Sequence, residues 1–128
     1  MIPSPDIVAI ALLRDDPVLA VLHGGRVSVE ALPGGAAVRV TLLPGVQQFS
    51  RWEWSAQVQV DVWADDQLDS ANLAAAIRDR WPYKRGQAGG GYVSGTWVVS
   101  DPMALQDPES KLPRYTLTLG LSVHEEPS

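Results

Sequence analysis

The spacing of apolar side chains changes abruptly in the middle of the chain. Residues 56–64 alternate between polar and apolar, and this period of two predicts a β-strand with valines on its buried face. Residues 66–81 instead place apolar side chains three to four positions apart, which predicts an α-helix. Asp65 or Asp66 is suited to cap that helix. A strand is therefore expected to run almost directly into a helix.

The N-terminal third is predicted to contain a helix followed by a β-hairpin. Ser4 and Pro5 are residues typical of a cap and a first helical turn, and an apolar face follows over residues 5–14. A second short turn of helix can follow, with two glycines at its end. Weak alternation on both sides of a Pro-Gly-Gly turn then predicts a hairpin over residues 26–43.

Two further strands are predicted in the C-terminal part, at residues 91–100 and 113–124. The last strand has the most regular alternation in the chain, and its apolar side chains are expected to face inward. Strand pairs separated by one helix favour an α+β fold, with a mainly antiparallel sheet of about five strands and two helices packed on one face. The length of 128 residues is typical of a single domain, residues 1–128.

The composition excludes several kinds of site and location. The chain has no cysteine, which excludes disulfides, thiolate nucleophiles and cysteine-type zinc sites. It has no run of about 20 apolar residues and no basic leader, so we expect a cytosolic protein without a membrane span. Because 15 acidic residues outnumber 10 basic ones, giving a net charge of −5, tight binding to duplex DNA is not expected.

Motifs for catalysis or cofactor binding are missing from the sequence. His23 and His124 have no second histidine at metal-ligand spacing, and we interpret both as exposed. In the glycine-rich segment 86–91 the basic residues precede the glycines and a strand follows, unlike a phosphate-binding loop. No serine lies in a nucleophile elbow. We therefore predict that the chain is not an enzyme and that it binds no cofactor or metal.

Several tryptophans and basic residues are candidates for contacts with other subunits. Trp81 and Trp97 lie on predicted apolar faces, so we expect both in the core. Trp63 falls on the polar parity of its strand, where it can cover a second layer or anchor a partner, since aromatic residues are enriched at the centres of interfaces. For the basic residues, ordinary solvated charges are an equal alternative. The residues expected at subunit or partner contacts are Arg51, Trp52, Trp63, Lys84, Arg85, Lys111 and Arg114.

Three short motifs lie in the same order as in a known protein family. Asp16 to Ala20 (D-P-V-L-A) follows the first helix, Val58 to Ala64 (V-Q-V-D-V-W-A) leads into an alanine-rich helix, and Arg114 to Leu119 (R-Y-T-L-T-L) begins the last strand. With this order of elements, the chain resembles the tail terminator, or tail-completion, proteins of long-tailed bacteriophages. The likeness extends from about residue 5 to residue 124.

The resemblance implies a structural virion protein with no catalysis and no cofactor. Proteins of this family form a hexameric ring on the finished tail tube, stop its polymerisation and present a surface to the head-completion proteins of the neck. The implied partners are further copies of the chain, the tail tube protein and a head-completion or neck protein. The implied location is the virion, at the neck end of the tail, after assembly in the host cytoplasm. DNA passes through such a ring without specific binding, and an acidic chain suits that role because like charges repel.

Two other classes of protein remain open. The first is another neck component, such as a head-closure or connector protein, which also forms rings or joins rings made by partners. The second is an unrelated small α+β ligand-binding domain, or an enzyme whose site the sequence does not reveal. The second class predicts a monomer or dimer with a closed pocket, whereas the virion proteins work by docking through heterologous surfaces.

Overall fold

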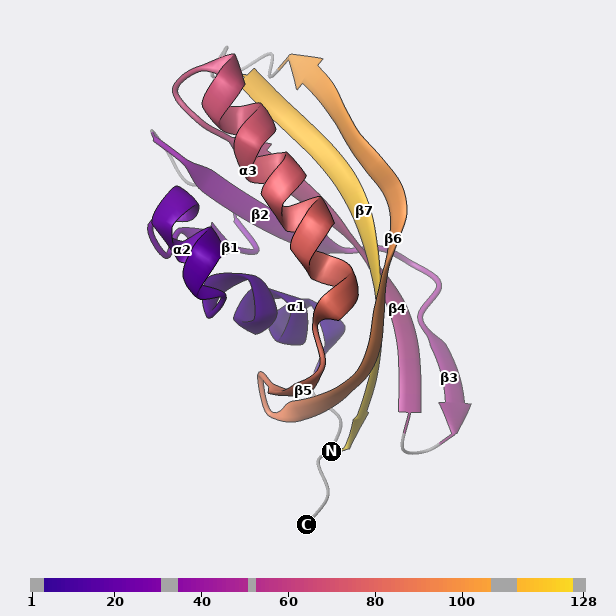
Figure 1. Cartoon of the computed structure of the whole chain (residues 1–128). Coiled ribbons are helices and arrows are strands. Elements are labelled where there is room, and N and C mark those ends of the chain that lie inside the picture. Colours follow the sequence, from indigo (N-terminus) through magenta and orange to yellow (C-terminus); the bar gives the residue numbers. More distant parts are fainter. Residues whose placement is uncertain (1–3, 31–34, 51–52, 107–112, 126–128) are drawn as a thin grey trace.

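The computed structural model describes residues 4–30, 35–50, 53–106 and 113–125. In these residues the chain forms an α+β fold, with three helices on one face of a mainly antiparallel sheet (Figure 1). The elements of this part are α1 (Pro5–Arg14), α2 (Pro17–His23), β1 (Val27–Ser28), β2 (Ala37–Leu42), β3 (Gln47–Ser50), β4 (Glu53–Trp63), α3 (Gln67–Arg80), the 3-10 turn η1 (Trp81–Tyr83), β5 (Gly86–Ala88), β6 (Gly91–Gln106) and β7 (Pro113–Glu125). The fold class is as expected, but the expected five strands and two helices are fewer than the seven strands and three α-helices found there.

The sheet has the strand order β1-β2-β4-β7-β6-β5, and β3 pairs with the beginning of β4. The central pair, β4 and β7, is antiparallel over its whole length, from Glu53 opposite His124 to Trp63 opposite Arg114. β2 covers the second half of β4, and β3 covers its first residues. The two central strands therefore have partners on both edges, whereas the longest strand, β6, has only the three residues of β5 on its outer edge in the part that the structure describes.

The predicted hairpin over residues 26–43 is wrong. β1 and β2 run parallel, with Val27 opposite Val38, and the Arg26 carbonyl accepts a hydrogen bond from the Val38 amide at 2.9 Å. β1 has only two residues, and Val29, which continued the alternation in the sequence, is exposed. An alternation that contains only two valines is too short to distinguish a full strand of a hairpin from a two-residue strand that leads into a loop.

The first two helices begin differently: Ser4 precedes α1 without a side-chain cap, whereas a side chain satisfies the first amides of α2. The Asp16 carboxylate accepts hydrogen bonds from the amides of Val18 and Leu19, at 2.9 and 3.2 Å, so it caps α2. Gly24 ends this helix in the left-handed region, with φ of 61°. The short helix that the sequence allowed is therefore present as a third helix, and it packs between α1 and α3.

The third helix has the buried stripe that its period predicts. Asp66, one of the two candidates, caps it by accepting from the Asp69 amide at 2.8 Å. Its side chains pack on β7, β6 and β4. The helix ends before Pro82, and Trp81, which follows it, is fully buried and donates from Nε1 to the Gly120 carbonyl at 2.9 Å. The buried residues of the stripe are Ser70, Leu73, Ala74 and Ile77.

The prediction for Trp97 is wrong, because its side chain lies on the helix-free face of the sheet and is 38% exposed. The register of β6 against β7 shifts between Val93 and Gly95. Such a bulge moves the following side chains to the opposite face, so Val93 and Thr96 are buried while Trp97 turns outward onto Gly120. The strand also continues to Gln106 instead of ending at residue 100. Pro102 is tolerated because no described strand pairs with the outer edge of β6 at that position.

Candidate functional site

The described residues contain no group of three or more His, Asp or Glu side chains that could hold a metal ion. None of the helices in this part of the chain is long and apolar enough to cross a membrane. Two hollows lined by described residues are open to solvent, one between α2 and the start of α3 and one at the end of α3. The candidate sites in the described part of the chain are exposed surfaces and the polar contacts that position them.

The helix-free face of the sheet carries a tryptophan between two arginines. Strand register places Trp63 of β4 directly opposite Arg114 of β7, and Arg39 lies on the neighbouring strand β2. The guanidinium carbons of Arg39 and Arg114 are 5.1 and 5.9 Å from the Trp63 ring centroid. These are cation–π distances. Only 6% of Trp63 is exposed, so this residue on the polar parity is buried within the chain, and the two cations lie over its ring.

A buried carboxylate lies next to this tryptophan on the same face. Arg39 donates from Nε and Nη2 to Asp61 Oδ2, at 3.2 and 2.8 Å. Gln59 Nε2 lies 3.3 Å from the other oxygen of the same carboxylate. The Asp61 side chain is fully buried, and a buried charge is tolerated only when it is paired and hydrogen-bonded. Arg39 thus holds both the aromatic ring and the carboxylate in place.

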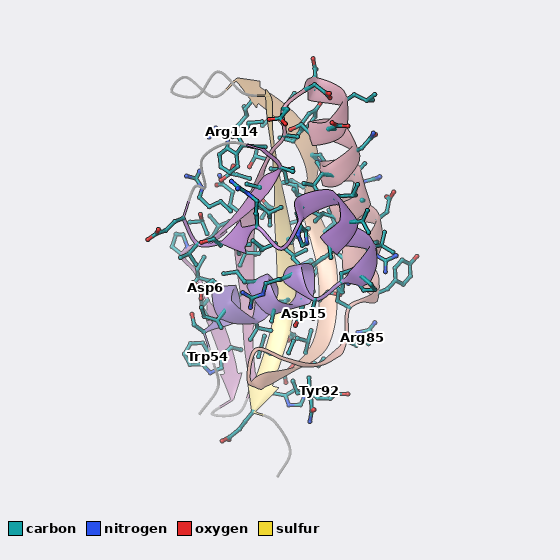
Figure 2. The ribbon with its side chains drawn as sticks, turned by 90° about the vertical axis from the view of Figure 1, so that its left-hand side faces the viewer. Asp6, Asp15, Trp54, Arg85, Tyr92 and Arg114 are labelled. Atoms are coloured by element: carbon teal, nitrogen blue, oxygen red, sulfur yellow. The ribbon has the colours of Figure 1, made fainter. Side chains whose placement is uncertain are left out.

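Arg114, predicted at a contact, has a buried donor that remains unused. Its Nε is inaccessible to solvent and has no hydrogen-bond partner among the residues that the structure describes. An unsatisfied buried donor costs about 1–3 kcal/mol. Arg114 lies at the end of the sheet far from Tyr92 and Trp54 (Figure 2). Its guanidinium is partly exposed and lies over the Trp63 ring.

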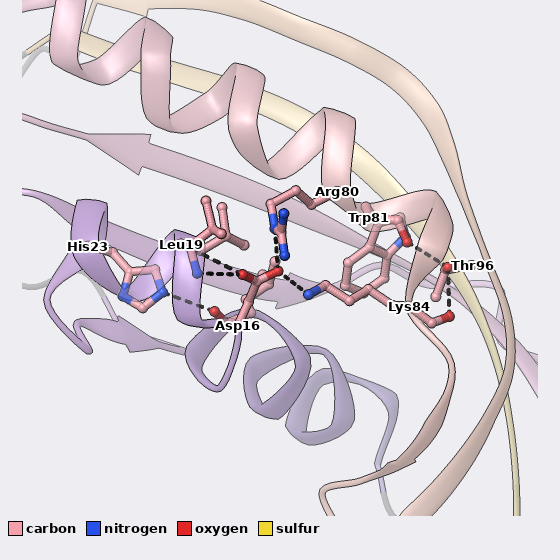
Figure 3. A network of polar contacts seen from close by, with 9 residues as sticks. Asp16, Leu19, His23, Arg80, Trp81, Lys84 and Thr96 are labelled. Atoms are coloured by element: carbon pink, nitrogen blue, oxygen red, sulfur yellow. Dashed lines mark hydrogen bonds and ion pairs between the residues drawn. The ribbon is translucent and has the colours of Figure 1, made fainter.

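A second cluster joins the start of α2 to the end of α3 (Figure 3). Asp16 Oδ2 accepts from Arg80 Nε at 2.7 Å and from Lys84 Nζ, while its Oδ1 caps α2. The Asp16 side chain is fully buried. Burial alone would raise the pKa of this carboxyl, but the hydrogen bonds from Arg80, Lys84 and the Leu19 amide outweigh burial and hold the pKa well below its usual range.

The same cluster fixes the segment after α3. The Thr96 hydroxyl lies 2.6 Å from the Trp81 carbonyl and 3.1 Å from the Lys84 carbonyl, and it donates to one of them at a time. Lys84 keeps only 16% of its side chain exposed, because it is paired with Asp16. Arg85 is exposed and donates to the Ser94 carbonyl at 2.8 Å. The turn therefore holds its exposed aromatic residue, Tyr83, on a rigid base.

The expectation that both histidines are exposed is wrong for His23, which is buried. Its Nδ1 accepts from the Gly25 amide at 2.9 Å, so the ring proton is on Nε2, which donates to the Leu13 carbonyl at 2.9 Å. The neutral ring links the end of α1 to the end of α2. His124 is partly buried, and its ring centroid is 4.8 Å from that of Tyr92. Both histidines have local structural contacts.

The structure brings the predicted contact residues together in two pairs. Trp63 and Arg114 share the helix-free face, and Lys84 and Arg85 share the end of α3. The other three, Arg51, Trp52 and Lys111, lie outside the described residues. The residues that position these pairs were missed from the sequence alone. Two signals could have identified some of them: Asp16 precedes a proline, as a helix cap often does, and an aromatic residue follows Pro82. The missed residues are Asp16, Arg39, Asp61, Arg80 and Tyr83.

Comparison with known proteins gives a shared fold. The sequence matches no known family profile, and none of the curated proteins is similar to it. A chain from the virion of a native gene transfer agent particle is 21% identical, with a TM-score of 0.70 over 94% of this chain and 95% of that one. Another solved chain, whose name states no function, is 19% identical, with a TM-score of 0.57 over 98% of this chain and 99% of the other. At such identities the likeness is one of fold.

Proposed function

We propose that this chain is a structural virion protein that forms a ring on a phage-type tail tube, ends tube polymerisation and offers a joining surface to the head. The observation that carries this proposal is the fold likeness to a chain of a gene transfer agent virion, which extends over nearly the whole of both chains. The three motifs that resemble tail terminators support it independently, because they come from the sequence alone.

Those motifs coincide with the framework of the fold. Asp16, in the first motif, is the centre of the cluster that joins α2 to α3. The second and third motifs are β4 and β7, the central antiparallel pair of the sheet. The resemblance therefore concerns residues that fix the architecture, and the specific function has to lie in the surfaces that this architecture presents.

The arrangement of the exposed surfaces supports a ring. A closed ring needs a heterologous interface, in which one patch meets a different patch on the next copy. The partly exposed residue Arg114 and the exposed residue Arg85 lie at different ends of the molecule (Figure 2). In the proposed assembly the chain is a hexamer at the neck of the tail, and its partners are the tail tube protein and a head-completion protein.

The net charge of −5 supports a ring through which DNA passes without adhering, because like charges repel in the lumen. Reversal of lumen-facing acidic residues should then slow DNA ejection. Unchanged ejection from particles that contain such variants would remove this part of the proposal.

A neck connector or head-closure protein is the second candidate, because likeness to a virion chain suits any ring in the particle. The test that separates the two uses the purified chain and the tail tube protein of the same genome. A terminator produces rings at one end of each tube and limits tube length, seen in negative stain and by light scattering. A chain that stays monomeric beside the tubes and has no effect on their length would contradict the proposal.

A further inference from the structure

We propose that neighbouring copies are joined through the two ends of α3. The α3 tip consists of Tyr83, Lys84 and Arg85, and its exposed residues, Tyr83 and Arg85, insert into the α2 hollow of the next copy. The residues that line the α2 hollow include Val21, Leu22, Ala36, Ala64, Asp65 and Asp69. This inference rests on the proposed ring and identifies the contact that closes it.

The α2 hollow is bordered by apolar side chains that are not buried within the chain. α2 has only seven residues, and its outward face consists of Val18, Val21 and Leu22, of which Val21 is 84% exposed. Leu68, in the first turn of α3, is also exposed. A short surface helix normally turns polar residues outward. Clustered apolar side chains with a polar rim instead mark a surface that another protein covers.

The rim of the α2 hollow is acidic. Asp65 and Asp69 line it, and neither carboxylate has an ion-pair partner among the residues that the structure describes. Asp66 lies between them and is used as the cap of α3. An apolar floor with free carboxylates at its rim fits a partner that combines an apolar or aromatic anchor with positive charge.

The α3 tip has that combination. Tyr83 is 83% exposed, although its neighbour Trp81 is fully buried. Asp16 and Asp79 contribute two negative charges here, and Arg80, Lys84 and Arg85 contribute three positive ones, which leaves a net charge of +1. Tyrosine is favoured as an interface anchor because it supplies a large contact area with few rotatable bonds.

The two surfaces cannot meet within one copy. They lie at opposite ends of α3, whose 14 residues span about 21 Å at 1.5 Å per residue. In Figure 1 the start of α3 is at the top, and the turn leading to β5 is at the bottom. The contact therefore has to be made between copies, head to tail, and a head-to-tail contact closes into a ring when its rotation allows.

The other candidate for copy-to-copy contact is the outer edge of β6, which is weaker. Beyond residue 93 no described strand pairs with that edge. The edge carries register shifts after Val98 and after Ser100, together with Pro102. Bulges and proline are the means by which proteins prevent strand addition at an open edge. The two ends of α3, which have opposite charges and place an exposed tyrosine against an apolar hollow, are therefore the better contact.

The test is a charge exchange across the proposed contact, read by ring formation with tail tube protein. Arg85→Glu and Asp65→Arg should each raise the concentration needed for ring formation about tenfold, because like charges then face each other. The double variant should restore it, since the pair is again opposite in sign. Arg14→Glu is the matched control: Arg14 is exposed on α1, and the change in net charge is the same as for Arg85→Glu.

A second pair of variants tests the aromatic anchor without relying on charge. Tyr83→Ser should weaken ring formation, whereas Met103→Ser, at another exposed apolar residue on β6, should leave it unchanged. Circular dichroism and thermal unfolding establish that each variant is folded. Both substitutions remove exposed side chains, so the folds of both variants are expected to be intact.

The outcomes separate this inference from the proposed ring function. Rings that cap tubes equally well with Arg85→Glu, Asp65→Arg and Arg14→Glu would overturn the α3 contact and leave the ring function in place. If the native chain caps no tubes, the ring function fails, and the same variants are compared for self-association by analytical ultracentrifugation. Equal self-association would then overturn the contact as well. A photo-crosslinker at position 83 that reacts only with tube protein, and not with another copy of this chain, would also overturn the α3 contact.

Discussion

The two faces of the central sheet bury their residues by different means. On the covered face, Val58, Val60 and Leu119 are fully buried beneath the helices. On the helix-free face, Asp61 and Trp63 are almost as inaccessible, but arginine side chains cover them. The covered face depends on apolar area removed from water, which is contributed by many residues. The helix-free face depends on a few specific polar contacts, so single substitutions there should have effects unlike those of ordinary surface charges.

The largest expected effect is on the covered face, at Trp81. Trp81→Ala should lower the free energy of unfolding by about 3–5 kcal/mol, because it leaves a large cavity and removes the donor to the Gly120 carbonyl. Urea unfolding followed by circular dichroism measures it. Because most of this loss comes from the missing volume of the side chain, a second substitution at a polar neighbour should not restore it. A loss below about 1 kcal/mol would mean that the core collapses around the missing ring.

On the helix-free face, Arg39→Ala should cost about 2 kcal/mol, less than a fully buried ion pair because Arg39 is partly exposed and water can enter. The loss comes mainly from the Asp61 carboxylate that remains buried without its partner. Adding Asp61→Asn to the Arg39→Ala variant should recover more than half of the lost free energy of unfolding.

Arg39→Ala, Asp61→Asn and the double variant together form a mutant cycle for this pair. Additive losses across that cycle would show that the two faces are stabilised in the same way, which would break the comparison.

The helix layer contains a network that responds to pH, centred on Asp16. Because its pKa is held below the ordinary value of 3.8, the folded state favours the carboxylate. The stability from this network is therefore fully present above that value and is lost as pH falls below it. Asp16→Asn keeps a helix cap but removes the charge, so it should cost about 2 kcal/mol at pH 7 and progressively less at pH 3 and below.

Asp15→Asn is the matched control for this pH dependence, since Asp15 is exposed and adjacent. Urea unfolding at pH 7 and pH 3 is the measurement. If Asp16→Asn lowers the free energy of unfolding by the same amount at both pH values, the assignment of the network is contradicted. Asp15→Asn should change the free energy of unfolding little at either pH.

The sequence was informative where the structure depends on local periodicity, and uninformative where it depends on pairing. The valines of β4, the stripe of α3 and the inward face of β7 follow from spacing alone, because each element repeats its pattern over many residues. The outward turn of Trp97 depends on a bulge defined by β7, and the parallel pairing of β1 depends on where α2 directs the chain. Neither is encoded in the residues around it.

The candidate surfaces follow the same division. Trp63 could be recognised as out of place on its strand, because parity is a local property. Its cover by Arg39 could not be foreseen, since that requires the register of β2 on β4. Likewise Lys84 was recognisable as a charged residue near a turn, but its pairing with Asp16 joins residues 68 positions apart. Polar contacts at long sequence separation are where prediction from the sequence ends.

The smallest expected effect on stability, at Arg114, is the one that best distinguishes folding from function. Arg114→Ala removes a cation–π contact with Trp63, worth about 0.5–1 kcal/mol, but it also removes a buried donor that has no partner in the described part of the chain. These terms oppose each other, so the free energy of unfolding should change by less than about 1 kcal/mol. If Arg114 is kept for a partner, as the sequence predicted, Arg114→Ala should weaken ring formation or head joining while the fold is unaffected. Thr118→Ala, on the same face of β7, is the control. Unchanged assembly together with a loss of several kcal/mol in stability would assign Arg114 to the fold, and the helix-free face would then be a covered surface like its opposite.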